Sequence, residues 1–218
     1  AALAALDVGP HIVRVERQSR LPVAKGLGSS SADIVATARA VAAAFNRSFA
    51  ADELATRAGA VEPSDPVMHD GVVVSRRRGG LLRRWDWSPA FTVAVLVPVT
   101  CATTPTGVLR PGPGTHDDLL DVVDAGAALR DAAPFLAAAR ASARRSERAA
   151  DPLVLATALH ARRFGALGWC VAHTGTATGL LFPDDTAGRE AAEAAVNDRS
   201  VAARSTAAFV AATPSRHR

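Results

Sequence analysis

One short segment carries most of the chemical information in this sequence, and it consists of Lys25-Gly26-Leu27-Gly28-Ser29-Ser30-Ser31. Its glycines let backbone N–H groups approach an anion closely and allow positive φ angles. The serines follow at the point where a helix is expected to begin, and the unpaired N–H groups of a helix N-terminus attract anions. A serine there can also offer Mg²⁺ the hard oxygen ligand that this ion prefers. The segment therefore predicts a phosphate-binding loop.

Two common phosphate-binding motifs do not describe this segment. The pattern GxxxxGK[ST] places a lysine after its glycines, whereas Lys25 precedes them. The dinucleotide-binding pattern GxGxxG needs a third glycine at the position that Ser31 occupies. The residues leave one alternative open, which is an ordinary glycine-containing turn followed by a serine helix cap. In that alternative Lys25 is a surface lysine beside a loop.

Helical and extended patterns alternate along the rest of the chain. Polar and apolar residues alternate over residues 11–17, which predicts a strand. A helix is expected from Ser29 or Ser30, with serine as its N-cap. A second helix is expected over about residues 51–58, with Gly59 ending it. Further helices are predicted at 117–130, 134–148, 152–164 and 186–196, and strands at 72–74, 81–82, 91–97, 169–172, 180–182 and 205–210. This interleaving predicts an α/β or α+β protein.

The charge of the chain is positive but small. The net charge is +4, yet the isoelectric point is about 10.3, because the chain has a single lysine and no tyrosine and arginine keeps its proton to about pH 12. The isoelectric point therefore overstates the basicity. A basic nucleic-acid-binding module is an alternative supported by the arginines at 76–78 and 83–84, but no aromatic residues are interleaved with them. Solvated hairpin faces are the simpler explanation, and we expect no nucleic-acid partner.

Nothing in the sequence indicates a membrane protein. No apolar run approaches the ~20 residues that span a bilayer, and the first residues lack the positive charge of a signal peptide. Cys101 and Cys170 lie far apart and show no metal-binding spacing. We expect a cytoplasmic protein with two reduced, buried thiols, and a disulfide is the alternative. The sequence does not indicate an oligomeric state.

The phosphate-binding segment resembles the second signature of the GHMP kinases, in which a proline and a short spacer precede Gly-Leu-Gly-Ser-Ser. The resemblance implies a two-lobed α+β fold with mixed sheets packed against helices. It implies a nucleotide-binding N-terminal domain at residues 1–97 and a C-terminal domain at residues 98–218. It also implies that residues 25–31 hold the phosphates of ATP, and that Ser30 binds Mg²⁺.

The order of the later motifs is similar to that of the same family, from about residue 21 to residue 196. The resemblance implies that Glu62 is a second Mg²⁺ ligand and that Asp65 is the base or orienting group for the attacking hydroxyl, with Asp70 as the reserve candidate. It implies that the glycine-rich segment Thr174-Gly175-Thr176 lines the substrate side of the site. Two structural alternatives stay open, namely a polar turn at residues 62–65 and a plain glycine hairpin at residues 173–179.

A finer similarity concerns the substrate. Residues 29–34 and the compact Glu-Pro-Ser-Asp at residues 62–65 look like the L-threonine kinase branch of the family, which is linked to cobalamin synthesis. The expected activity is therefore ATP-dependent phosphorylation of a hydroxyl on a small metabolite, L-threonine or a related amino alcohol. The expected cofactors are ATP and Mg²⁺, and the expected partner is the small alcohol itself.

One feature of the family is not found. GHMP kinases carry an earlier N-terminal signature that helps to form the substrate pocket, and no matching residues precede the phosphate-binding segment. The chain also begins with Ala1 rather than Met, so we expect that part of the N-terminal domain is missing in front. A catalytically inactive ligand-binding regulator of the same fold is the alternative.

Overall fold

The computed structural model describes residues 13–76, 78–99, 117–146, 149, 151–172, 175–202 and 204–213. The chain forms two compact units, which we describe separately. Unit 1 comprises Ala1–Val23 and Gly28–Arg84, and unit 2 comprises Ala24–Leu27 and Trp85–Arg218. The division after Arg84 differs from the expected boundary at residue 97, because the strand that contains residue 97, Phe91–Pro98, pairs within the sheet of unit 2.

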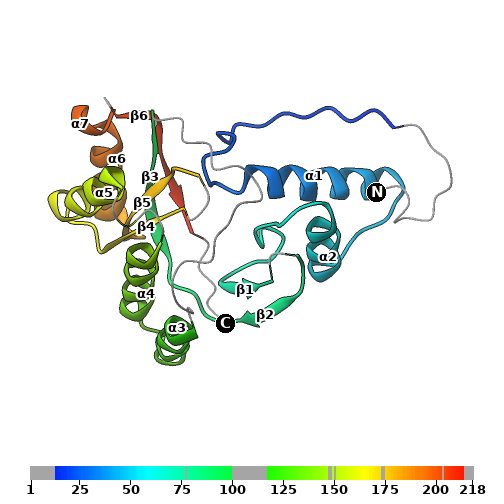
Figure 1. Ribbon diagram of the computed structural model, residues 1–218, viewed down its shortest axis with the longest axis horizontal. Coiled ribbons are helices and arrows are strands. Elements are labelled where there is room, and N and C mark those ends of the chain that lie inside the picture. Colours follow the sequence, from blue (N-terminus) through cyan, green and yellow to red (C-terminus); the bar gives the residue numbers. More distant parts are fainter. Residues whose placement is uncertain are drawn as a thin grey trace. The chain divides into compact units, whose positions relative to one another are not determined.

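The described part of unit 1 contains two helices and a short hairpin (Figure 1). Helix α1 (Ser29–Ala44) and helix α2 (Ala51–Val61) are followed by strands β1 (Val73–Ser75) and β2 (Leu81–Arg84), which pair antiparallel. The two helices share a small apolar core. Its buried members are Val35, Ala38, Leu54, Ala55, Ala58 and Met68.

The two helices of unit 1 begin and end differently from what the sequence predicts. The N-cap of α1 is Gly28, with φ 67°, and no side chain caps the helix, so the expected serine cap is wrong. Helix α2 continues past Gly59 to Val61. A Cβ at residue 59 would lie 2.2 Å from the backbone carbon of Arg78. Gly59 therefore lets the hairpin turn pack against α2, and it does not end the helix.

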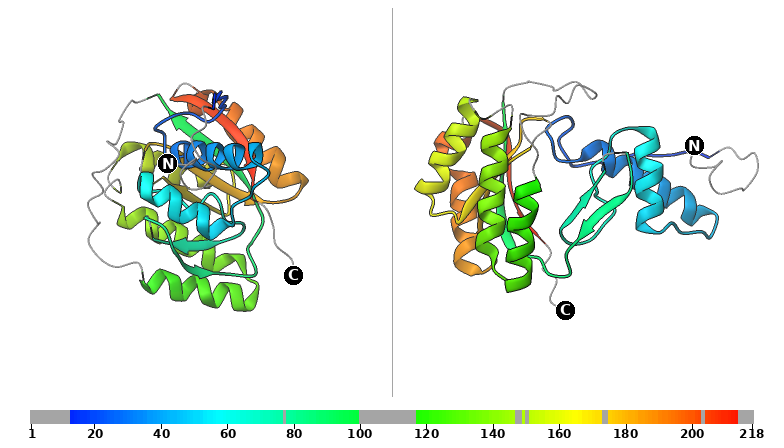
Figure 2. Two further views of the ribbon diagram at one scale, coloured as in Figure 1. Left: turned by 90° about the vertical axis from the view of Figure 1, so that its right-hand side faces the viewer. Right: turned by 60° about the horizontal axis from the view of Figure 1, so that its bottom comes forward.

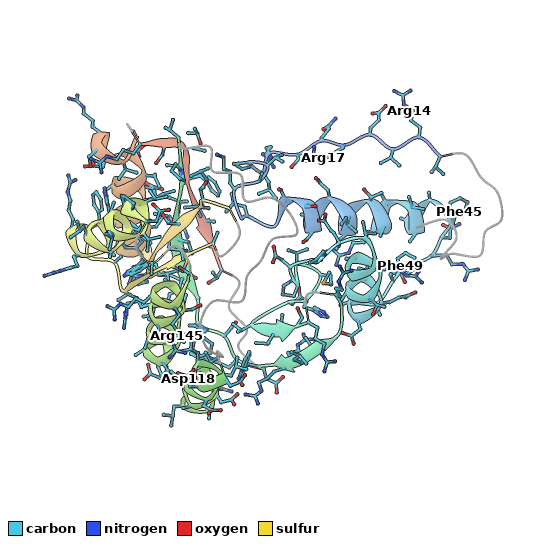
Figure 3. All side chains as sticks on the ribbon, viewed as in Figure 1. Arg14, Arg17, Phe45, Phe49, Asp118 and Arg145 are labelled. Carbon is cyan, nitrogen blue, oxygen red and sulfur yellow. The ribbon has the colours of Figure 1, made fainter. Side chains whose placement is uncertain are left out.

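The predicted strand at residues 11–17 does not form over its described part. Residues 13–20 lie outside any helix or strand, and His11 and Ile12 are outside the described residues. A strand needs a hydrogen-bonded neighbour, and the two-stranded sheet of unit 1 contains only β1 and β2. The segment is held to α1 instead by an ion pair of 2.8 Å between Arg17 and Asp33; Arg17 is labelled in Figure 3.

Unit 2 is built on a four-stranded antiparallel sheet with the order β4-β5-β3-β6. These strands are β3 (Phe91–Pro98), β4 (Gly168–Val171), β5 (Thr178–Pro183) and β6 (Ser205–Ala212). Strand β3 lies between β5 and β6, so that Val93 faces Leu181 on one side and Ala211 on the other. Apolar and polar residues alternate less along β3 than along a half-exposed strand, because most residues of β3 are buried.

Five helices of the described part of unit 2 complete this unit (Figure 2). They are α3 (Asp117–Leu129), α4 (Ala132–Arg145), α5 (Pro152–Arg163), α6 (Thr186–Asn197) and α7 (Arg199–Ala202). Helix α4 packs on β4, α5 on β5, and α6 on β3. Arg145 forms a two-pronged ion pair with Asp118, which joins α4 to α3 and lowers the pKa of the Asp118 carboxyl; both are labelled in Figure 3.

Most predicted elements of this unit are confirmed within a few residues. The helices expected at 117–130, 152–164 and 186–196 and the strand expected at 91–97 all form. Helix α4 begins two residues earlier than expected and ends at Arg145. The short α7 was not expected; the Asp198 carboxylate accepts a hydrogen bond from the Ser200 amide at its start. The helix and sheet content confirms the α+β class, but the expected mixed sheets are wrong for the described residues, because every described strand pair is antiparallel.

The expectations about membrane spans and about the cysteine thiols can be compared with the structure. Within the described residues, no helix combines the length and the apolar character that a membrane span requires. Cys170 is a free thiol, and its burial raises the pKa of the thiol to about 11, so it stays protonated at neutral pH. Cys101 lies outside the described residues.

Candidate phosphate-binding and metal-binding site

The N-terminus of α1 in unit 1 presents the geometry of an anion site. Gly28 adopts a left-handed conformation, and the helix begins at Ser29 without a side-chain cap. The first turn closes with a 2.8 Å hydrogen bond from the Ala32 amide to the Gly28 carbonyl oxygen. Because the first N–H groups of a helix have no partner within the helix, these amides can bind an anion. Ser30 is exposed here, whereas Ser29 and Ser31 are buried.

The two residues expected to bind Mg²⁺ lie side by side in unit 1. The Ser30 hydroxyl donates a short hydrogen bond to Oε1 of Glu62. Glu62 directly follows α2 and caps its C-terminal end, so the two helices bring together a hydroxyl and a carboxylate oxygen. These are the hard ligands that suit Mg²⁺, which commonly uses one or two carboxylates and completes its shell with phosphate and water.

The Ser30 and Glu62 oxygens suit a metal ion that binds together with a nucleotide better than a metal ion held by protein side chains alone. Among the described residues, no group of three or more His, Cys, Asp or Glu side chains gathers closely enough to hold a metal ion. A Ser30–Glu62 pair next to unpaired helix amides supplies two ligands and leaves the others to phosphate oxygens. The site therefore suits an ion that is bound together with its phosphate.

The loop that carries Asp65 is fixed to the same end of α1. The backbone amide of Asp65 donates a 2.9 Å hydrogen bond to the Ser31 hydroxyl, and the Ser64 hydroxyl donates a 3.0 Å hydrogen bond to the Glu62 carbonyl oxygen. A Cβ added to Gly28 would lie 3.5 Å from Oδ2 of Asp65. The exposed Asp65 carboxylate therefore lies beside the first turn of α1. Asp70 is also exposed and follows later in the loop, before β1.

In unit 2, residues 24–27 are held by the glycine-rich segment near the end of the sheet. The Lys25 carbonyl oxygen accepts hydrogen bonds from the amides of Thr176, at 3.1 Å, and Ala177, at 2.8 Å. Gly175 has φ 86°, and a Cβ there would lie 2.2 Å from the Gly26 nitrogen. Only glycine allows this backbone contact. The sequence pattern did not predict the contact, although both segments contain glycines that adopt positive φ.

The other expected substrate residues are only partly described. Thr174 lies outside the described residues. Thr176 is buried, and its hydroxyl has no hydrogen-bond partner within the described part of the chain. Leu27 and Gly26 lie in the same short stretch as Lys25, and Gly26 has φ 83°. Their roles toward a ligand stay predictions.

Sequence reasoning missed a cavity on unit 1. It has a volume of about 560 Å³ and lies between α1 and α2. Its walls are mostly apolar, with one acidic and one basic side chain, and they are Asp33, Ile34, Thr37, Ala38, Phe49, Arg57, Ala60 and Val61. Asp33 is the partner of Arg17, and this hydrogen bond raises the pKa of the Arg17 guanidinium.

Comparisons with known proteins agree with this description. Residues 1–69 match the family model described as the GHMP kinases N terminal domain. The crystal structure of homoserine kinase from Cytophaga hutchinsonii ATCC 33406 has a similar fold, with a TM-score of 0.63 and 15% sequence identity over 91% of this chain and 69% of that chain. No curated protein matches the chain. The family match supports the expected resemblance to the GHMP kinases over residues 1–69, and the structural match supports the expected α+β fold; neither comparison bears on the L-threonine kinase branch.

Replacing Gly175 by alanine tests the contact between residues 24–27 and 175–177. The new Cβ would collide with the backbone of Lys25 and Gly26, so the hydrogen bonds to the Lys25 carbonyl should weaken. We expect the amide hydrogens of Thr176 and Ala177 to exchange about tenfold faster or more, as overpacking predicts. Amide exchange followed by NMR measures this change without any ligand.

Gly165→Ala is the matched control for that substitution. Gly165 also has a left-handed φ, of 68°, but a Cβ there would meet nothing within 4 Å. Gly165→Ala therefore introduces the strain of alanine at a positive φ, of order 1 kcal/mol, without a steric collision. Equal exchange of the Thr176 and Ala177 amides in the two variants would show that the close contact with Gly26 does not exist.

Proposed function

We propose that this chain is an ATP-dependent kinase that phosphorylates a hydroxyl of a small metabolite, L-threonine or a related amino alcohol. One observation carries the proposal most directly. A helix N-terminus with unpaired amides, a hydroxyl–carboxylate pair formed by Ser30 and Glu62, and the carboxylate of Asp65 occur together in unit 1. The match to the GHMP kinase N-terminal domain and the fold support a small-molecule kinase.

In this proposal residues 25–31 bind the phosphates of ATP. The backbone amides at the start of α1 donate hydrogen bonds to the phosphate oxygens, and the helix dipole adds roughly 0.3–1 kcal/mol. Gly26 and Gly28 have positive φ, so their amides can turn toward an anion. Lys25 adds a positive charge close in sequence to this loop. The side chain of Leu27 has no polar group, so its part is limited to its backbone.

Ser30 and Glu62 would hold Mg²⁺ through their oxygens. When bound with ATP, the ion would offset the negative charge of the phosphate oxygens during transfer. Glu62 is held at its place by the end of α2 and by the hydroxyl of Ser30. Ser30 is held by the first turn of α1. Both ligands therefore stand on rigid elements, which favours a reproducible position for the bound nucleotide.

Asp65 would orient the hydroxyl that attacks the phosphorus and accept its proton. Phosphoryl transfer depends mainly on positioning and on charge stabilisation, so a carboxylate that aligns the alcohol suffices. The Asp65 carboxylate lies next to Gly28, beside the proposed phosphate position. Thr174, Gly175 and Thr176 would line the substrate side of the site, as the resemblance implies; the support within unit 2 is the hydrogen bond from the Thr176 amide to the Lys25 carbonyl oxygen.

A direct test of the activity is Mg²⁺-dependent release of ADP. The assay combines the protein with ATP and, in turn, L-threonine, L-homoserine, mevalonate and several sugars. We expect turnover with L-threonine above all others. Turnover with another alcohol would keep the kinase and reject the substrate. Binding of Mg·ATP without turnover would favour an inactive regulator, and no binding of ATP would reject the proposal.

The assignment of the base separates Asp65 from Asp70. Asp65→Asn keeps the size of the side chain but cannot accept the proton, so kcat should fall about 10²–10⁴-fold while the affinity for ATP stays close to that of the wild type. Asp70→Asn should lower kcat far less. Steady-state kinetics and nucleotide titrations of both variants measure these effects. The reverse pattern, with the larger loss in the Asp70 variant, would move the role to Asp70.

A further inference from the structure

The serines of the segment at residues 29–31 have different environments, although they are identical in sequence. Ser30 is exposed, whereas Ser29 and Ser31 are only 8% and 3% exposed. The Ser31 hydroxyl accepts a 2.9 Å hydrogen bond from the backbone amide of Asp65. Ser31 is therefore turned into unit 1, toward the loop that follows α2, and its hydroxyl is engaged there.

Consecutive residues of α1 thereby hold two acidic residues of one loop. Ser30 binds the side chain of Glu62, and Ser31 binds the backbone of Asp65. Between them, the buried Ser64 donates its hydroxyl proton to the Glu62 carbonyl oxygen, and Pro63 limits φ at its own position. The loop is thus fastened at both ends to a single helical turn, with an internal hydrogen bond between the ends.

The bond from Asp65 to Ser31 controls the direction in which the Asp65 side chain leaves the loop. A backbone amide that loses its acceptor away from water is unfavourable, so the loop should shift to find another partner if the hydroxyl is removed. The Asp65 carboxylate lies beside Gly28, and its own backbone amide is anchored to Ser31 one turn further along the helix. A small shift of this carboxylate would misalign the hydroxyl that it orients.

We infer that Ser31 is a positioning residue, which sets the place of Asp65 relative to the start of α1 without touching the nucleotide. The inference rests on the proposed function of Asp65. It assigns the hydroxyl of Ser31 to the acid–base half of the site rather than to phosphate binding. The neighbouring Ser30 serves the metal-binding half, so the order of the two serines along the helix separates the two tasks.

Ser31→Ala and Ser31→Thr test this inference in steady-state kinetics. Alanine removes the acceptor and has a higher helix propensity than serine, so α1 should stay intact. We expect kcat to fall about 100-fold, because misplacement of a reacting group has an effect of this size. The KM for ATP should stay within about twofold of the wild-type value, because the helix amides are unchanged. Threonine keeps the hydroxyl and should restore most of kcat.

Thr157→Val is the matched control for the loss of a buried hydroxyl. Thr157 is 1% exposed and donates its hydroxyl proton to the Leu153 carbonyl oxygen within α5 of unit 2. This variant should lower the melting temperature and leave kcat unchanged. If it lowers kcat as much as Ser31→Ala does, the kinetic effect comes from general destabilisation and the inference is wrong.

Hydrogen exchange of the Asp65 amide gives a readout that does not need activity. The wild-type and Ser31→Thr proteins should protect this amide, and Ser31→Ala should expose it. A normal kcat in Ser31→Ala, or an equal loss in Ser31→Ala and Ser31→Thr, would overturn the positioning role. If the wild-type protein protects the Asp65 amide but turns over no alcohol, the proposed function is wrong, and the positioning role is wrong with it. The hydrogen bond between Ser31 and Asp65 would then have a structural role alone.

Discussion

The hydrogen bonds between the first turn of α1 and residues 62–65 are the constraint on which the candidate site depends. They bring the carboxylate of Glu62 to the hydroxyl of Ser30, and the backbone of Asp65 to Ser31. Without them, the acidic loop would be an ordinary polar turn after α2. The apolar contacts between α1 and α2 hold the two helices at the distance that lets these polar groups meet.

The second constraint is the close approach of backbone segments at two glycine positions. In unit 1, Gly59 lets the turn at Arg78 approach α2. In unit 2, Gly175 lets the segment of Lys25 and Gly26 lie against the amides that follow β4. Each contact is closer than any Cβ would allow, so these glycines are required for packing. Gly28 differs, because its positive φ begins a helix and leaves the first amides uncapped.

The sequence predicted the helices and the sheet strands of unit 2 well, because their apolar periodicity and flanking turns are strong local signals. It predicted Glu62 and Asp65 as site residues only through resemblance to the GHMP kinases. It could not assign a separate contact to Ser31, since three adjacent serines carry the same local signal and only the fold distinguishes them. The strand predicted at residues 11–17 was wrong over its described part, because alternation alone cannot supply a pairing partner. The helix end predicted at Gly59 was wrong because the residue that packs against Gly59, Arg78, is not a neighbour in the sequence.

The most direct test of this account is the Mg²⁺ dependence of ATP affinity in the wild-type and Glu62→Ala proteins. We expect Mg²⁺ to strengthen ATP binding to the wild type. Glu62→Ala should remove about 10–100-fold of this gain, the range typical of changes around a metal site, without loss of folded structure. Glu53→Gln, at an exposed carboxylate of α2 that pairs with Arg57, should behave as the wild type. A Glu62→Ala protein with the full Mg²⁺ dependence would contradict the proposed metal site.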